Sequence, residues 1–112
     1  MVDIIDKNLN DKLNLIYNNI FIDIEQIENK KFIKFFNMWF KKTNNFYYKD
    51  YDKKHAKDLL NKVYEKLIKK KVKNLNISKS KHLITYDYKK TKININITSL
   101  NKGQLNYIII RQ

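Results

Sequence analysis

The chain has 112 residues, 43% of them hydrophobic, which suits one small globular domain. It contains no cysteine, so a disulfide scaffold, a thiol nucleophile and a cysteine-based zinc site are excluded. Residues 1–28 carry a net charge of −4 and residues 29–112 a net charge of +17, which indicates a polyanionic partner for the second part.

The composition is rich in Lys, Asn and Ile, as the coding bias of an AT-rich genome would produce. That bias does not explain why most acids come early and most lysines late. No apolar run approaches the ~20 residues of a membrane span. The acidic start, residues 1–6, has the pattern of neither a signal peptide nor a transit peptide, so we expect the protein to act where it is made.

Two helices are predicted before residue 43. Apolar residues recur every three or four positions from Asn10 to Ile27, although Ile20–Ile24 also alternates like a short strand. The aromatic segment Lys30–Lys42 follows and would form a helix capped by Asn29, with its aromatic rings on one broad apolar face.

A polar, tyrosine-rich connection, Thr43–Tyr51, leads into a basic helix predicted from about Lys53 to Val72. Asp50 or Asp52 is its expected N-cap. Its buried stripe is expected to consist of Ala56, Leu59, Leu60, Val63 and Leu67, with Ile68 as a further candidate.

A short loop that contains Asn76–Lys79 is expected after the basic helix. From His82 onward the chain alternates with a period of two, which is typical of strands. His82–Tyr88 and Lys92–Thr98 are predicted to form a hairpin with a cationic turn at Lys89–Thr91. Leu105–Ile110 fits either a third strand or the start of a helix. The predicted fold class is α+β, with N-terminal helices, a basic central helix and a C-terminal antiparallel β-hairpin or three-stranded sheet.

Five short motifs, each weak by itself, follow one another in an order that is typical of a known family. They are Met38-Trp39-Phe40, the helix Ala56–Lys71 that ends in two lysines, Ile77-Ser78-Lys79, the alternating strand Lys92–Thr98, and Lys102-Gly103 before the apolar run Tyr107–Ile110. In this order the chain resembles, over about residues 38–112, the N-terminal part of the third protein of the small ribosomal subunit, which has a type-II KH domain.

The chain departs from that family in three places. The connection after Trp39 is longer, Lys102 replaces a proline, and the sequence stops at Gln112, near where the Gly-x-x-Gly clamp of KH domains should begin. The resemblance therefore implies half of a type-II KH domain, completed by another chain. We expect residues 1–37 to be an acidic-to-aromatic extension and residues 38–112 to be the basic RNA-binding half-domain.

The resemblance implies a structural constituent of the small ribosomal subunit, organelle-encoded and mitochondrial, in the head near where mRNA enters. Its partners would be rRNA and neighbouring small-subunit proteins, on which the acidic, aromatic N-terminal part would dock. The alternative is a small basic nucleic-acid- or host-interacting protein of an AT-rich virus or mobile element, working in the cytoplasm. Its acidic helix would then serve dimerisation or partner binding.

Phosphate contact is expected from the lysine-rich helix and hairpin. Lysine lacks the bidentate fork of arginine, which favours recognition of backbone and shape over base edges. The candidate RNA-binding residues are Lys53, Lys54, Lys57, Lys62, Lys66, Lys69, Lys70, Lys71, Lys73, Lys79, Lys81, Lys89, Lys90, Lys92, Lys102 and Arg111. Tyr47, Tyr48 and Tyr51 could stack on unpaired bases, or could pack into a loop.

No pattern for catalysis was found. The sequence has no nucleophile–base pair in a motif context, no glycine-rich phosphate loop and no metal-ligand spacing around His55 or His82. We therefore expect a protein that is not an enzyme and needs no metal, cofactor or membrane.

Overall fold

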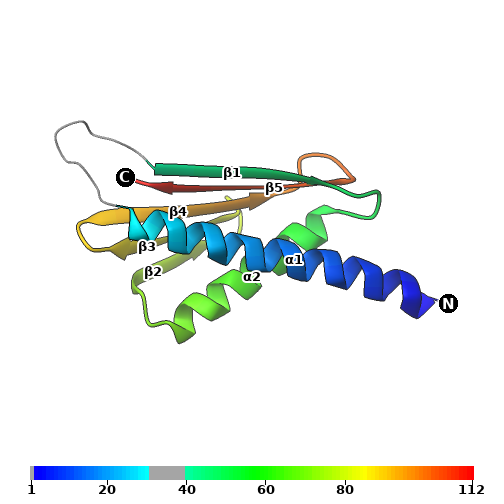
Figure 1. Cartoon of the computed structure of the whole chain (residues 1–112), viewed down its shortest axis with the longest axis horizontal. Helices are drawn as coiled ribbons and strands as arrows, with labels where there is room; N and C mark the ends of the chain where they lie inside the picture. Colours follow the sequence, from blue (N-terminus) through cyan, green and yellow to red (C-terminus); the bar gives the residue numbers. More distant parts are fainter. Residues whose placement is uncertain (1, 31–39) are drawn as a thin grey trace.

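The computed structural model describes the backbone of residues 2–30 and 40–112, and the side chains of residues 8–30 and 40–112 (Figure 1). These residues form an α+β fold, as predicted. The helices are α1 (Val2–Asn29) and α2 (Lys53–Lys69). The strands are β1 (Phe40–Tyr47), β2 (Lys73–Ser78), β3 (Leu83–Tyr88), β4 (Thr91–Thr98) and β5 (Gln104–Arg111).

All five strands form one antiparallel sheet in the order β1-β5-β4-β3-β2. Alternate residues of β4 and β5 are buried, which is the period-two pattern of a sheet covered on one face. Both helices pack on that face, α1 over β5 and β1 and α2 mainly over β4 (Figure 1). The sheet is thus wider than the hairpin or three-stranded sheet that the sequence predicted.

Helix α1 is longer than its predicted range of Asn10–Ile27. Ile20 and Ile24 are fully buried, whereas Ile22 between them is 52% exposed. This spacing of four residues is helical, so the alternative of a strand over Ile20–Ile24 is wrong. Each fully buried isoleucine contributes about 1.5–3 kcal/mol relative to an exposed one, which holds α1 against the sheet.

Helix α2 begins where the sequence predicted and ends three residues earlier. Asp52 is the N-cap, and its side chain accepts a hydrogen bond from the Lys53 backbone nitrogen at 2.6 Å. The imidazole Nδ1 of His55 accepts the reciprocal bond from the Asp52 nitrogen at 3.1 Å, which completes a capping box. The predicted stripe is buried, except that Ile68 is 51% exposed.

Two strands were not predicted. Phe40–Lys42 lie at the start of β1 and not in an aromatic helix; the rest of that predicted helix, residues 31–39, falls outside the described part. The first half of the tyrosine-rich connection is also β1, and residues 73–78, expected as loop, form β2. Both are edge strands whose polar residues hide the alternation.

The C-terminal prediction is confirmed for β3 and β4, and residues 105–110 are strand and not helix.

The β4–β5 turn contains Gly103 at φ +87, a conformation that residues with a Cβ rarely adopt. Its nitrogen donates to the Tyr51 carbonyl at 2.7 Å, and its carbonyl accepts from the Tyr48 nitrogen at 3.0 Å. The turn is thereby tied to the segment that leads into α2.

One hydrophobic core joins α1, α2 and the sheet. The N-terminal helix therefore buries its apolar face within this fold, and the expected boundary between residues 37 and 38 lies outside the described residues. In the described part of the chain, neither helix is long and apolar enough to span a membrane.

Candidate nucleic-acid interface

Seven of the predicted lysines gather at one end of the sheet. Helix α2 ends beside the first residue of β2, and β2 pairs with β3, so the turn between α2 and β2 lies next to the β3–β4 turn (Figure 1). All seven residues are exposed. We call this set the hairpin-end cluster: Lys69, Lys70, Lys71, Lys73, Lys89, Lys90 and Lys92.

The backbone holds two of these lysines in an unusual conformation. Lys71 has φ 57 and Lys89 has φ 56, the left-handed region that glycine or asparagine normally occupies. Lys71 closes α2 in a Schellman arrangement: its nitrogen donates to the Ile68 carbonyl, and the Val72 nitrogen donates to the Leu67 carbonyl. The structure thus places lysine at both turns where a glycine would cost less.

Two carboxylates among the described residues lie beside the hairpin-end cluster: Glu65, which lines a cavity together with Lys69, and Asp87. Asp87 lies between Lys73 and Lys92 in the strand register. It accepts a hydrogen bond from Asn74 Nδ2 at 2.6 Å, and Lys92 Nζ is 4.0 Å from its other oxygen. Exposed ion pairs of this kind are worth ~0–1 kcal/mol, so the end of the sheet keeps a strong positive charge.

Asn74 and Asp87 were not predicted as site residues. Their partnership depends on the pairing of β2 with β3, and β2 had been predicted as a loop. The sequence around Asn74 does not alternate as β3 and β4 do, because Asn74 has φ 54 and lies at a shift in the strand register.

The other predicted lysines lie elsewhere. Lys53, Lys57, Lys79 and Lys81 lie on or beside the N-terminal half of α2, and Lys102 lies in the β4–β5 turn. Lys54 and Lys62 line the space between the helices. Lys66 is directed toward α1, where its Nζ lies 4.3 Å from the centroid of the Phe21 ring and 5.6 Å from that of Tyr17.

Arg111 corrects the sequence prediction, because its side chain is only 3% exposed and is directed into the protein. Its Nη1 donates to the carbonyls of Ile27, Glu28 and Lys30 at 2.9–3.1 Å, and its Nε donates to Thr91 Oγ1 at 2.9 Å. The last turn of α1 has no basic residue of its own, so Arg111 supplies the cation that a helix C-terminus favours. It is a structural residue and does not reach RNA.

The three tyrosines differ. Tyr47 is 73% exposed at the end of β1 and is free to contact a base. Tyr48 is half-buried, with Lys12 Nζ 4.8 Å from its ring centroid. Tyr51 is 4% exposed and packs edge-on against Tyr48, with ring centroids 5.5 Å apart. Tyr51 therefore belongs to the core, which is the packed alternative to base stacking.

Two acids of α1 are bound inside the fold. The Tyr107 hydroxyl donates to Asp23, and the Tyr86 hydroxyl donates to Glu28 at 3.0 Å. Burial and the hydrogen bond to Asp23 raise the pKa of Tyr107 to about 12. Burial, together with the Glu28 carboxylate, raises the pKa of Tyr86 above its ordinary value. The acids thus fix α1 on the sheet, and both phenols stay neutral near pH 7.

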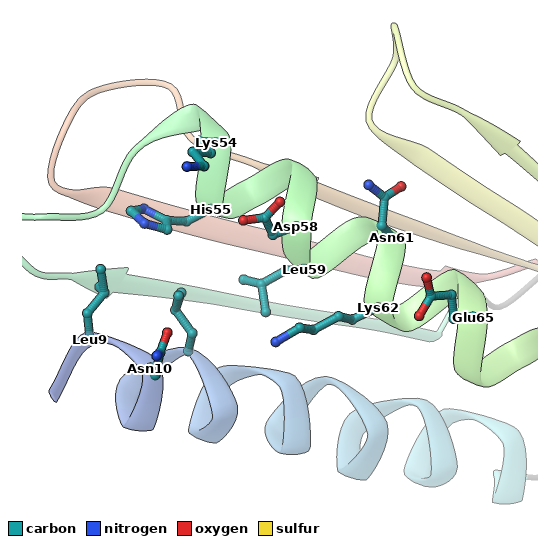
Figure 2. Close-up of a pocket in the computed structure, with 10 residues that line it drawn as sticks. Leu9, Asn10, Lys54, His55, Asp58, Leu59, Asn61, Lys62 and Glu65 are labelled. Atoms are coloured by element: carbon teal, nitrogen blue, oxygen red, sulfur yellow. The ribbon is translucent and has the colours of Figure 1, made fainter. Parts of the chain in front are cut away.

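A cavity of about 590 Å³ lies between α1 and α2 (Figure 2). Leu9 and Asn10 of α1 face His55 of α2 across it, with charged side chains of both signs along α2. The lysines there are balanced by Asp58 and Glu65. His55 Nδ1 is already used by the capping box. This groove therefore offers less to a polyanion than the hairpin-end cluster does.

Comparisons with known proteins give no relative. No family model, no curated protein and no solved structure matches the chain. In the described part of the chain, no group of three or more His, Cys, Asp or Glu side chains is arranged to hold a metal ion.

Proposed function

We propose that this chain is a non-catalytic RNA-binding protein that contacts phosphates through the hairpin-end cluster. One observation carries the proposal: seven exposed lysines from two segments, Lys69–Lys73 and Lys89–Lys92, meet at one end of the sheet, with Asp87 and Glu65 as the neighbouring acids among the described residues. Concentrated lysine charge without an accessible arginine favours contact with phosphates and with the shape of the RNA. Binding would release counterions from the RNA and so depend steeply on salt.

The backbone of the cluster supports the same conclusion. Asparagine is also frequent in this composition, with 16 residues against 23 lysines, and is the better residue for a left-handed turn. Lysine nevertheless occupies positions 71 and 89, at a conformational cost of ~1 kcal/mol each. A phosphate partner accounts for that cost, because both side chains project from the ends of turns.

The RNA that we propose is that of a small ribosomal subunit, most simply a mitochondrial one. The sequence resemblance over residues 38–112 supports this narrower proposal, and the exposed cluster supplies the contact it needs. Neighbouring ribosomal proteins, including a chain that completes the KH domain, would be the other partners. The acids Asp23 and Glu28 already have partners within the fold, so docking on a neighbour would use other residues of α1.

The direct test is fluorescence anisotropy with labelled small-subunit rRNA fragments across a range of salt concentrations. Seven phosphate contacts predict a slope of log K against log salt of roughly −5 to −6. Lys71→Gln, Lys89→Gln and Lys90→Gln together should weaken binding and reduce the slope by ~3. The matched control, which removes the same charge from Lys49, Lys54 and Lys102, should leave most of the affinity.

A flat salt dependence, or equal loss in the two triple variants, would contradict the proposal. Sedimentation of the native protein tests the ribosomal part separately. Migration with the small subunit, reversed by ribonuclease or high salt, supports it. A free homodimer near the top of the gradient would instead favour the nucleic-acid-binding protein of a virus or mobile element.

A further inference from the structure

A second cationic site lies away from the hairpin-end cluster, along the seam between the N-terminal half of α2 and the β2–β3 loop. One cavity on this seam has a volume of about 350 Å³ and is lined by Lys57, Leu60, Asn61, Lys79 and Ser80. That volume falls within the range of about 300–1,000 Å³ typical of sites for small ligands. The two lysines come from different elements, so a charged ligand between them would touch both α2 and the loop.

The polar groups of this cavity are those that a phosphate requires. Lys57 and Lys79 supply ammonium donors, Asn61 an amide and Ser80 a hydroxyl, above the side chain of Leu60, which is 1% exposed. Asn61 also lines the groove between the two helices, so it lies on the part of α2 that both cavities share (Figure 2). Ser80 Oγ lies 3.4 Å from Ser78 Oγ, which leaves the Ser80 hydroxyl at the rim.

A second, separate cavity of about 230 Å³ is lined by Lys53, which lies one helical turn before Lys57 on α2. Its other walls are His82 from the loop and Thr98, Ser99 and Leu100 after β4. Leu100 is 72% exposed, an unusual place for a large apolar side chain. The imidazole and this leucine offer a planar and an apolar surface beside the cationic cavity, and we call the two cavities together the α2–loop furrow.

None of the described residues that line the α2–loop furrow carries a carboxylate. The nearest acids on α2 are turned elsewhere. Asp52 caps the helix through its bond to the Lys53 nitrogen, and Asp58 lines the groove toward α1. The furrow therefore combines positive charge, hydroxyl and amide donors, and an apolar platform, whereas the groove between the helices mixes both signs of charge.

We infer that the α2–loop furrow binds one unpaired nucleotide of the RNA, with its phosphate between Lys57 and Lys79 and its base against Leu100 and His82. This inference rests on the proposed RNA-binding function and extends it. The hairpin-end cluster would contact the backbone of structured RNA, whereas the furrow would hold a single splayed nucleotide, the form in which single-stranded RNA is usually recognised.

The test compares two RNA probes, a short oligouridine and a duplex, with inorganic phosphate as a third ligand. Lys57→Gln with Lys79→Gln should weaken oligouridine binding ~10-fold and change duplex binding much less. The matched control, Lys54→Gln with Lys62→Gln, removes the same charge from the opposite flank of α2 and should leave oligouridine binding unchanged. All four side chains are exposed, so the fold should survive each double substitution.

Leu100→Ala separates a nucleotide site from a simple anion site. It changes no charge, and we expect it to weaken oligouridine binding while leaving inorganic phosphate binding unchanged. If Leu100→Ala has no effect, or if the Lys57/Lys79 variant behaves like its control, the furrow is not a nucleotide site.

The duplex probe shows which proposal has failed. If the hairpin-end triple variant binds the duplex more weakly and the furrow variants change no affinity, the nucleotide site in the furrow is overturned and the proposed function stands. A duplex that does not bind the unmodified protein overturns the proposed function and the furrow with it.

Discussion

Replacing Arg111 tests the assignment of this residue to structure and not to RNA contact. Arg111→Met keeps a long side chain but removes the four hydrogen bonds that the guanidinium donates to other described residues. Three backbone carbonyls at the end of α1 lose a hydrogen-bond donor, and so does the Thr91 hydroxyl. The bonds to the Ile27 carbonyl and to the Thr91 hydroxyl are buried, so water cannot replace these two without opening the contact between α1 and β5.

The magnitude follows from the number and kind of these bonds. Hydrogen bonds to a charged group are worth ~1.5–3 kcal/mol each, but bonds that share one side chain do not add. We expect Arg111→Met to lower the free energy of unfolding by about 3–5 kcal/mol, as for other broken buried charge networks. Total stabilities of small domains are about 5–15 kcal/mol, so the loss will be plain in urea unfolding followed by circular dichroism.

Lys92→Met is the matched control, because it also replaces a cation by methionine but at an exposed position. Its side chain is 56% exposed, so its loss should cost less than ~1 kcal/mol of stability. It should, however, weaken RNA binding, whereas folded Arg111→Met should bind RNA as tightly as the unmodified protein. If Arg111→Met loses less than ~1 kcal/mol, or loses as much RNA affinity as Lys92→Met, the structural role of Arg111 is refuted.

Three further predictions concern the turns and a buried phenol. Lys71→Asn with Lys89→Asn should raise the free energy of unfolding by up to ~1 kcal/mol and weaken RNA binding, because asparagine tolerates positive φ and carries no charge; a loss of stability would contradict this. Gly103→Ala should lower the free energy of unfolding by ~1–2 kcal/mol, because alanine rarely adopts φ +87. A clash is not the cause, since the nearest atom to an added Cβ, a carbonyl oxygen, is 3.5 Å away. An unchanged urea midpoint would exclude this cost. Stability should fall between pH 10 and about 12, because the unfolded tyrosine loses its proton near pH 10 and folded Tyr107 keeps it up to about 12. Tyr107→Phe should reduce that fall in urea midpoints, and an identical pH profile would argue against the buried phenol.

The sequence predicted those elements whose periodicity comes from burial on one face. Buried residues recur every three or four positions along helix α2 and at alternate positions along β4 and the first part of β3. Asp52, one of the two expected N-caps, marks the start of α2. Strand β1 was missed because its central residues are polar. Its strand conformation depends on pairing with β5, which is more than fifty residues away in sequence, and no local pattern reports that pairing.

The candidate site was predicted in kind but not in arrangement. The lysine-rich segments predicted a polyanionic partner. Which of these segments lie side by side is known only from the pairing of β2 with β3. Arg111 and Tyr51 look like surface residues because charge and hydroxyl groups usually lie outside. Their burial depends on tertiary partners, the α1 carbonyls and the Tyr48 ring, which a single sequence does not show.

The position of β5 has a consequence for synthesis. This strand lies between β1 and β4 in the sheet but is made after the four others. It also carries Arg111 and Tyr107, which hold α1 across more than eighty residues of sequence. Until β5 leaves the translating ribosome, β1 has no neighbour and α1 lacks most of its anchors, so this fold is expected to close late and slowly. A nascent chain of this kind, with apolar faces still uncovered, is exposed to aggregation until the last strand arrives.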